Sequence, residues 1–251
     1  SVHSFPTRRS SDLTPLLYLG KSGRQPEIGT RTPGRSADGA FRSRQTCREP
    51  DRGACARYTL GRMPHSYLIT GANRGIGLEL ARQLKGRGET VIGTARDTED
   101  AVELKAVADR TEKLEITSEV SLERLASKLE HTAIDCLIHN AAVGPRSGPA
   151  ESLDFDELLR DFEVNAVGAM RVAAAFLPSV RMGSLKKIVF ITSQMGSIGA
   201  QASGDHYGYR ASKAALNMLG RCLSLELRPE EVTVLLVHPG WVRTRMGGQQ
   251  A

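Results

Sequence analysis

The fold of this chain is decided by residues 66–88, SYLITGANRGIGLELARQLKGRG. An apolar run of strand length, 66–70, leads into a glycine-rich turn and then into a helical pattern that ends at glycine. Gly71, Gly75 and Gly77 allow a tight turn and let the backbone approach a phosphate closely. A helix that begins directly after such a turn offers free N–H groups to an anion. This strand–turn–helix therefore predicts a pyrophosphate-binding turn.

The rest of the chain continues the alternation of short apolar runs and longer amphipathic ones. Such an order predicts an α/β fold with a doubly wound parallel sheet, Rossmann-like, in a single domain. Ligands bind such sheets beyond the carboxyl ends of the strands, so residues just after strands are the candidates for a site. Further strands are expected at 90–95, 113–117, 135–140, 187–193 and 232–238, and the main helices at 77–88, 121–130, 153–177 and 209–227.

The net charge of +6 is unevenly distributed over the 251 residues. Residues 1–62 hold eleven Arg, one Lys and five acidic residues, whereas the remainder holds 22 basic and 23 acidic ones. From Met63 onward nothing indicates a nucleic-acid-binding face, and no apolar run approaches the about 20 residues of a membrane span. The four cysteines form no C-x-x-C pair, and no histidines stand at zinc-ligand spacing. These features favour a cytoplasmic chain with reduced cysteines and no metal.

Residues 1–62 are expected to be a disordered and non-native basic extension. They are rich in Arg, Ser, Gly, Pro and Thr and show no sustained periodicity. Their first residues, SVHSFPTRRSSDL, look like translated sequencing-adapter sequence, which makes Met63 the expected start of a domain covering 63–251. The alternatives are a targeting arm, although transit peptides are poor in acidic residues, and a nucleic-acid-binding arm.

The end of the second predicted strand distinguishes NAD from NADP. It reads GTARD, with Ala95 where an acidic residue would hold a ribose hydroxyl. Arg96 comes next, and Arg74 lies within the glycine turn. Two guanidiniums near one ribose suit a 2′-phosphate, which arginine binds bidentately, so NADP is favoured. In the alternative, both arginines are solvated and Asp97 holds the hydroxyl of NAD.

The stretch HYGYRASK contains a candidate acid–base pair. Tyr209 and Lys213 are four residues apart and share one face of a helix, whereas Tyr207 has an alanine at that spacing. A nearby ammonium is expected to lower the pKa of the Tyr209 phenol from ~10, which makes it a usable general acid or base. Ser193, at the end of the fifth strand, can hydrogen-bond a substrate oxygen that gains charge. Alternatively, Ser193 only caps a turn, and Ser197 is a second candidate.

Two further polar features stand where a ligand would lie. Asn165 is a polar residue on a mostly apolar helix face, and the alternative is an amide satisfied within the core. HPGWVRT follows the sixth strand, and Pro239 with Gly240 would let the chain turn close to a ligand. Val242 and Thr244 would then lie beside that ligand, unless the segment is an ordinary loop.

Together these motifs resemble the short-chain dehydrogenase/reductase family. The resemblance rests on TGANRGIG, HNAA, Asn165, Ser193, YRASK and PGWVRT, in the family's order from Met63 to the end. The details are similar to small carbonyl-reductase-like members related to the C-factor group. The family resemblance implies hydride transfer between a nicotinamide and a small-molecule carbonyl or alcohol. It implies neither nucleic acid nor a membrane as a partner. The implied catalytic residues are Asn165, Ser193, Tyr209 and Lys213.

The resemblance also implies individual roles. Tyr209 is the general acid/base, Ser193 contacts the substrate oxygen, and Lys213 holds the nicotinamide ribose and tunes Tyr209. Asn165 positions a water that relays protons to Lys213, and Glu115 stands where the family usually has an aspartate. Asn140 and Ala141 would line the adenosine side, and Val242 and Thr244 would meet the carboxamide. The implied cofactor-binding residues are Gly71, Asn73, Arg74, Gly75, Ile76, Gly77, Arg96, Glu115, Asn140, Ala141, Tyr209, Lys213, Pro239, Gly240, Val242 and Thr244.

The sequence departs from the family in three places. His139 and Ala142 alter a motif that usually reads N-N-A-G, and Arg245 stands where the nearest relatives usually carry an acid. The chain also ends at GGQQA, where family members continue, so a C-terminal truncation is expected. The alternative function is therefore a catalytically impaired dinucleotide-binding protein. The helices that carry Asn165 and Tyr209 are also expected to be able to form a homodimer, as the family often does.

Overall fold

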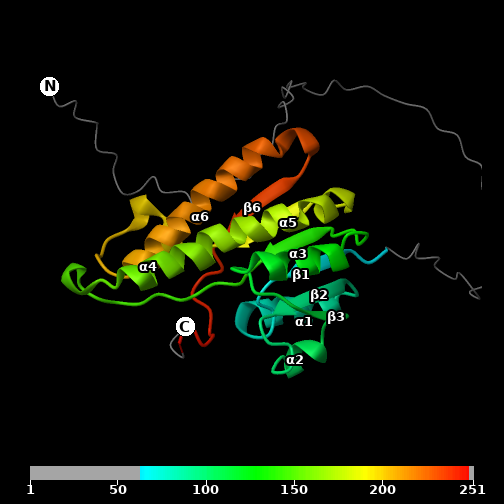
Figure 1. The fold of residues 1–251 in the computed structure, drawn as a ribbon, viewed down its shortest axis with the longest axis horizontal. Coiled ribbons are helices and arrows are strands. Elements are labelled where there is room, and N and C mark those ends of the chain that lie inside the picture. The colour runs from blue at the N-terminus through cyan, green and yellow to red at the C-terminus, as the bar shows by residue number, and fades with distance from the viewer. Residues whose placement is uncertain (1–62, 249–251) are drawn as a thin grey trace, which may run out of the picture. The chain divides into compact units, whose positions relative to one another are not determined.

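A computed structural model describes residues 63–248. The predicted basic extension, 1–62, and the last residues, 249–251, lie outside the described part. Within it, six strands form one parallel sheet in the order β3-β2-β1-β4-β5-β6 (Figure 1). The order reverses between β1 and β4, where open α/β sheets bind their ligands. The strands are β1 (Ser66–Ile69), β2 (Thr90–Ala95), β3 (Arg110–Lys113), β4 (Cys136–His139), β5 (Lys187–Ile191) and β6 (Thr233–Val237).

Helices cover both faces of this sheet (Figure 1). On one face, Leu78 of α1 and Leu104 of α2 join a single buried cluster. On the other, α3, α5 and α6 contribute to a larger cluster. The expected doubly wound, Rossmann-like fold is thereby confirmed. The helices are α1 (Gly75–Gly86), α2 (Val102–Lys105), α3 (Glu119–Lys128), α4 (Phe155–Phe162), α5 (Gly168–Met182) and α6 (Tyr207–Glu226), with a π-helical turn η2 (Glu163–Val167) and 3-10 turns η1 (Ala150–Ser152), η3 (Gln194–Gly196), η4 (Ile198–Ala200) and η5 (Arg228–Glu230).

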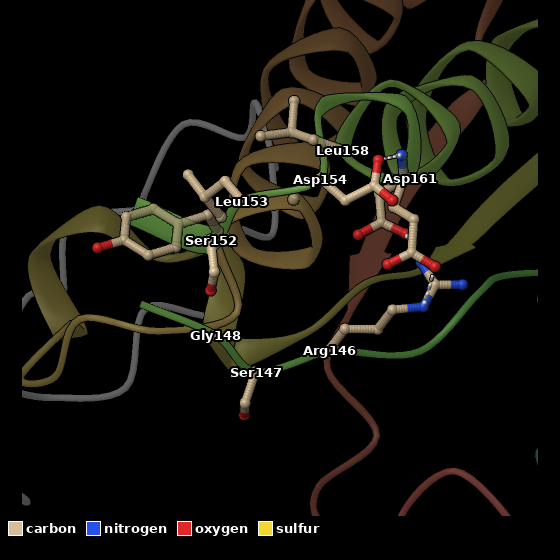
Figure 2. Close-up of a pocket in the computed structure, with 11 residues that line it drawn as sticks. Arg146, Ser147, Gly148, Ser152, Leu153, Asp154, Leu158 and Asp161 are labelled. Carbon is tan, nitrogen blue, oxygen red and sulfur yellow. Dashed lines mark hydrogen bonds and ion pairs between the residues drawn. The ribbon is translucent and has the colours of Figure 1, made fainter. Parts of the chain in front are cut away.

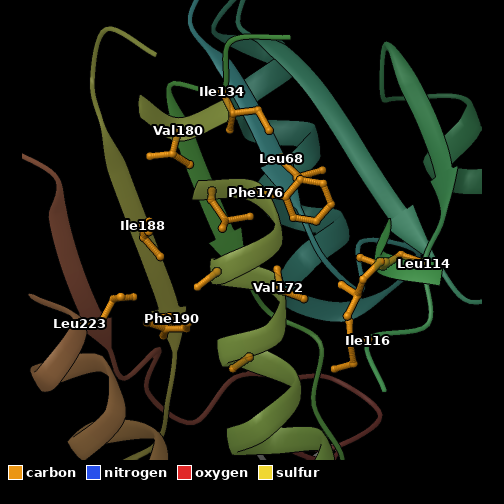
Figure 3. Close-up of a cluster of buried hydrophobic side chains, with 14 of the residues drawn as sticks. Leu68, Leu114, Ile116, Ile134, Val172, Phe176, Val180, Ile188, Phe190 and Leu223 are labelled. Atoms are coloured by element: carbon orange, nitrogen blue, oxygen red, sulfur yellow. The ribbon is translucent and has the colours of Figure 1, made fainter. Parts of the chain in front are cut away.

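Successive residues of the central strands point into different cores. Leu68 of β1 belongs to the larger cluster, whereas the next residue, Ile69, belongs to the smaller one. This alternation follows from the pleat of a strand. Phe176 of α5 is fully buried in the larger cluster (Figure 3), and replacing such a phenylalanine by alanine typically costs about 3–5 kcal/mol. The two cores hold the sheet rigidly, so that its carboxyl edge can position a site.

The third strand differs from its predicted position, 113–117. The observed strand, Arg110–Lys113, pairs in register with Ile92–Ala95 of β2. The apolar residues that suggested the later strand, Leu114 and Ile116, are buried just after it. Their hydrophobicity marks burial in the core rather than strand pairing, which explains the shift.

The long helix predicted at 153–177 runs from Phe155 to Met182 as α4, η2 and α5. It continues past Pro178, which lies inside α5. Proline removes one backbone donor from a helix. Phe176 and Val180 flank Pro178 and are both fully buried, so core packing holds the turn in place. The short helix α2 was not predicted, because four residues are too few to show a helical period.

None of the helices in residues 63–248 is both long and apolar enough to cross a membrane. The same residues contain no group of three or more His, Cys, Asp or Glu that could hold a metal ion. Cys136 is buried and Cys222 is exposed, and both are free thiols.

Candidate active site

The glycine turn between β1 and α1 depends on backbone freedom and on a close contact with the loop after β4. Gly71 and Gly75 have φ values of +61° and +56°, which disfavour any side chain. A Cβ on Gly77 would lie 2.6 Å from the amide nitrogen of Asn140, so that position also requires glycine. That amide donates to the carbonyl oxygens of Thr70 (3.1 Å) and Gly71 (2.9 Å). Asn140 therefore fastens the β4 loop to the turn.

Thr70 was not singled out from the sequence, although it directly follows β1 at the start of the turn. Its buried hydroxyl accepts the backbone N–H groups of Asn140 (3.0 Å) and Ala141 (3.2 Å). The hydroxyl proton is then left for Nδ1 of His139, 3.2 Å away. His139 is therefore the tautomer protonated at Nε2. Burial, with the Lys213 charge, lowers the pKa of His139 to about 3, so the ring is neutral.

This arrangement accounts for one departure from the family motif. The histidine of HNAA supplies a neutral acceptor, Nδ1, to the Thr70 hydroxyl and so completes the hydrogen bonds that hold the β4 loop. Its other nitrogen, Nε2, is buried and has no hydrogen-bond partner among residues 63–248.

The carboxyl edge of the sheet near β2 carries the residues predicted to distinguish NAD from NADP. Arg74 is the N-cap residue of α1 and makes no side-chain capping bond, so the first N–H groups of α1 stay available to an anion. Arg96 is exposed after β2, and its Nη1 lies 4.0 Å from Oε2 of Glu115. Burial lowers the pKa of Arg74, and the charges of Arg245 and Arg96 lower it further. This glycine cradle with clustered guanidiniums fits the phosphates of a dinucleotide.

The loop after β3 places Glu115 at this edge. Its Oε1 accepts hydrogen bonds from the backbone N–H (3.3 Å) and hydroxyl (3.0 Å) of Thr117. The carboxylate is thus oriented by its own loop. Asn73 and Ile76, in the glycine turn, are both half-buried.

The structure brings Tyr209, Lys213 and Ser193 together. Tyr209 and Lys213 lie on one face of α6, with Nζ of Lys213 5.9 Å from the centroid of the phenol ring. Ser193 follows β5, and its hydroxyl lies near enough to the Tyr209 phenol to oppose the rise of that phenol's pKa. Lys213 donates to the carbonyl oxygen of Ile191 at 3.0 Å. The four-residue spacing on α6 thus aligns Tyr209 with Lys213, and the end of β5 positions Ser193.

The expected direction of the Tyr209 pKa is wrong for this structure. Burial raises the pKa of Tyr209, the Ser193 hydroxyl opposes the rise, and the Asp161 carboxylate adds to it. Lys213 does not reverse this direction. Its own burial lowers the pKa of Lys213 to about 8, which weakens the cation that was expected to stabilise a phenolate.

Asn165 lies on the π-helical turn η2, a feature frequent at functional sites. Its Oδ1 accepts the N–H of Val143 (2.9 Å), and its Nδ2 donates to the Val143 carbonyl (3.3 Å) and the Ser212 hydroxyl (3.0 Å). Ser212 in turn donates to the carbonyl oxygen of Tyr209 at 2.9 Å. Both amide protons of Asn165 are therefore used within the protein, and the chain of bonds ends at the turn that carries Tyr209.

The segment after β6 returns to the glycine turn. Gly240 has a φ of +82°, which sharpens the turn after Pro239. Thr244 packs against the turn, because a Cβ on Gly75 would lie 3.4 Å from its Cγ2. Val242 lies between these points and is exposed. The predicted residues of this segment thus lead from the end of β6 to the glycine turn.

A comparison of the whole chain with known proteins agrees with this geometry. The family model described as short chain dehydrogenase matches residues 66–251. The chain belongs to the short-chain dehydrogenase family. The membership expected from the motifs is thereby confirmed.

Individual relatives of the chain include curated proteins and solved structures. C-signal from Myxococcus xanthus is 46% identical over 118 residues, which are 47% of this chain and 71% of that protein. The carbonyl reductase Sniffer of D. melanogaster has a TM-score of 0.71 at 30% identity, over 75% of this chain and 86% of that one. The NADPH-bound carbonyl reductase from chicken fatty liver has a TM-score of 0.68 at 30% identity, over 74% of this chain and 79% of that one.

The chain also has a pocket beside the helix turn that carries Tyr209 (Figure 2). Asp161 is buried there, and its Oδ1 accepts no hydrogen bond but lies 3.5 Å from Nη1 of Arg146. A Cβ on Gly208 would lie 2.5 Å from Oδ2 of Asp161, so this carboxylate presses against the start of α6. Burial raises the pKa of Asp161. The pocket is lined by Arg146, Ser147, Gly148, Ser152, Leu153, Asp154, Glu157, Leu158, Asp161, Tyr207 and Gly208.

Asp161 was also missed by the sequence reasoning. The available signal was an acidic residue four positions before Asn165 on the same helix. Its closeness to α6 depends on how two helices pack, which spacing along one helix does not reveal.

Proposed function

We propose that this chain is an NADP-dependent oxidoreductase that transfers a hydride between the nicotinamide and a small carbonyl or alcohol substrate. The observation that carries the proposal is the meeting of three groups: the Ser193 hydroxyl, which lies near enough to affect the pKa of the Tyr209 phenol, and Lys213, whose Nζ lies 5.9 Å from the centroid of that phenol ring. These groups follow β5 and begin α6, at the carboxyl edge of the sheet where the glycine turn also lies. Acid–base chemistry and phosphate binding would therefore meet at one edge of the sheet.

A bound nicotinamide would supply or accept the hydride. Tyr209 would donate its phenolic proton to the carbonyl oxygen as that oxygen gains charge, and Ser193 would donate a hydrogen bond to the same oxygen. The raised pKa of Tyr209 keeps the phenol protonated at neutral pH, which suits the general acid of a reduction. Lys213, with its pKa lowered to about 8, is a group that can return a proton to Tyr209.

Asn165 would act by positioning. Its amide ties Val143 of the β4 loop to Ser212 of α6, and through Ser212 it holds the backbone of Tyr209. A water relay to Lys213, as the family resemblance implies, would have to use a group of η2 other than the two amide protons of Asn165.

The preference for NADP is supported by Arg74 and Arg96, which flank the position expected for the adenosine ribose. Ala95 ends β2 and offers no carboxylate for a ribose hydroxyl. The solved carbonyl reductase from chicken fatty liver holds NADPH, which favours the same cofactor here.

The experiment that tests this proposal compares two tyrosine variants. Tyr209→Phe should lower the rate of NADPH oxidation with a panel of aldehydes and ketones by about 10²–10⁴-fold, since the proton donor is lost. Tyr207→Phe, two residues away and partly exposed, is the matched control and should retain its rate. NADPH binding, followed by fluorescence, should persist in both variants. Undiminished turnover in Tyr209→Phe would contradict the assigned role.

A second candidate function is a dinucleotide-binding protein with impaired catalysis. The exposure of Trp241 (72%) and Val242 (37%) favours it, because these residues follow β6 where a substrate would be enclosed. Tight NADPH binding by calorimetry, without turnover of any carbonyl in the panel, would support this alternative over the first.

We also propose that the chain forms a homodimer through α4 and α6. Both helices expose large apolar side chains: Phe155 (69%) and Leu159 (64%) on α4, and Met218 (65%) and Leu225 (51%) on α6. A second copy packed on these two helices would cover these side chains. Sedimentation of the wild type and of Leu159→Glu should show a dimer and a monomer respectively, and a monomeric wild type would rule this dimer out.

A further inference from the structure

We infer that Arg245 is a third cofactor-binding arginine, which joins Arg74 and Arg96 around the 2′-phosphate of NADP. The sequence showed Arg245 only as a departure from an expected acid. The inference rests on the proposed function and deepens it, because it names a residue from the segment after β6 as a determinant of cofactor choice.

The first observation is the position of the neighbouring residue. Thr244 packs on the glycine turn, with its Cγ2 3.4 Å from the place of a Cβ on Gly75. Arg74 immediately precedes Gly75, and Arg245 immediately follows Thr244. Arg74 and Arg245 are therefore the sequence neighbours of the two residues, Gly75 and Thr244, that make this contact.

The second observation is that the segment is held by its own hydrogen bonds. The backbone N–H of Gly247 donates to the Thr244 hydroxyl (3.0 Å), and that of Gly248 donates to the Thr244 carbonyl (2.9 Å). On the far side, Met246 packs at the β4 loop, with its Cγ 3.0 Å from the place of a Cβ on Gly144. Arg245 lies between these two contacts and is exposed, so its backbone is fixed while its guanidinium can reach a ligand.

The third observation is the gathering of like charges. The pKa of Arg74 is lowered by burial, then by the charge of Arg245, and then by that of Arg96. Arg96 has a distant acidic partner, Glu115, at 4.0 Å. Within residues 63–248, no carboxylate forms an ion pair with Arg74 or Arg245. A guanidinium that two others repel is an arrangement that a dianionic phosphate would neutralise.

The 2′-phosphate is favoured over the pyrophosphate as the common ligand. Arg96 follows β2, the strand whose end faces the adenosine ribose in this fold. The pyrophosphate is instead expected at the N–H groups of α1. A group shared by Arg74, Arg96 and Arg245 would thus be the phosphate on the ribose.

The test measures binding rather than activity. Dissociation constants for NADPH and NADH are determined by fluorescence titration for the wild type, Arg245→Gln and Arg245→Lys, with 2′,5′-ADP and 5′-ADP as competing probes. Arg124→Gln, an exposed arginine of α3, is the control for the loss of one charge. Arg245→Gln should weaken NADPH and 2′,5′-ADP about tenfold, which corresponds to about 1.4 kcal/mol. Its binding of NADH and 5′-ADP should stay unchanged, and Arg245→Lys should recover part of the loss.

Three results would count against the inference. Equal weakening of NADPH and NADH would place Arg245 at the pyrophosphate or give it a purely structural role. Unchanged NADPH binding in Arg245→Gln, with a wild type that binds NADPH, would overturn this inference alone and leave the proposed function standing. A wild type that binds neither dinucleotide would overturn both.

Discussion

The Thr70 hydroxyl offers a sharp test of how the glycine turn is held. Thr70→Val keeps the shape of the side chain but removes three hydrogen bonds, from the N–H groups of Asn140 and Ala141 and to Nδ1 of His139. Thr70 and His139 are almost fully buried, so water cannot easily replace the lost partner. At about 1–3 kcal/mol for each buried polar group left unpaired, and with partial relaxation, the expected loss of stability is about 3 kcal/mol.

The assay is urea unfolding followed by circular dichroism. Thr70→Val should lower the unfolding midpoint without changing the m-value, because the folded surface stays the same. Thr111→Val is the matched control, since the Thr111 hydroxyl is buried on β3 without a hydrogen-bond partner among the described residues. It should be neutral or slightly stabilising. A difference below about 1 kcal/mol between the two variants would refute this account of the Thr70 hydrogen bonds, since one buried unpaired group alone costs that much.

The remaining predictions concern pH. The Asp161 carboxylate raises the pKa of Tyr209. Asp161→Asn should therefore lower the pH at which kcat/KM for carbonyl reduction begins to fall. The control Asp156→Asn, at an exposed position of α4, should leave that pH unchanged. His139 has a pKa of about 3 when folded and ~6.5 when unfolded. The unfolded chain therefore binds the proton first, and stability is lost as the pH falls below ~6.5, by about 2 kcal/mol at pH ~5. In His139→Gln this part of the pH dependence should disappear from urea unfolding, and an unchanged slope would show that His139 is not the group responsible.

Much of the phosphate end could be predicted because it is local. Gly71 and Gly75 adopt positive φ within a few residues of each other, and the strand before them and the helix after them are adjacent in sequence. The pairing of Tyr209 with Lys213 was equally accessible, since four residues along a helix place two side chains on one face. The fold class followed from the alternation of strands and helices and was confirmed.

Where the prediction failed, the missing information was burial. The pKa of Tyr209 rises because neighbouring elements exclude water from the phenol, and no local spacing reveals that. The strand expected at 113–117 was misplaced for a related reason. Leu114 and Ile116 are buried in the core but lie outside the paired residues of β3. The hydrogen bonds of the Asn165 amide were equally hidden from the sequence, because Val143 and Ser212 lie far from it along the chain, and its role in a water relay stays a prediction.

The sequence by itself determined the glycine turn, the Tyr209–Lys213 face and the doubly wound class, because each follows from periods and spacings within short segments. Only the tertiary structure decided which groups from different strands meet. It placed Thr70 against His139, Asp161 against the start of α6, and Thr244 beside the glycine turn. Parallel strands joined by crossovers bring their carboxyl ends to one edge, whatever their separation along the chain. Contacts at that edge therefore depend on strand order and helix packing, which are properties of the assembled sheet.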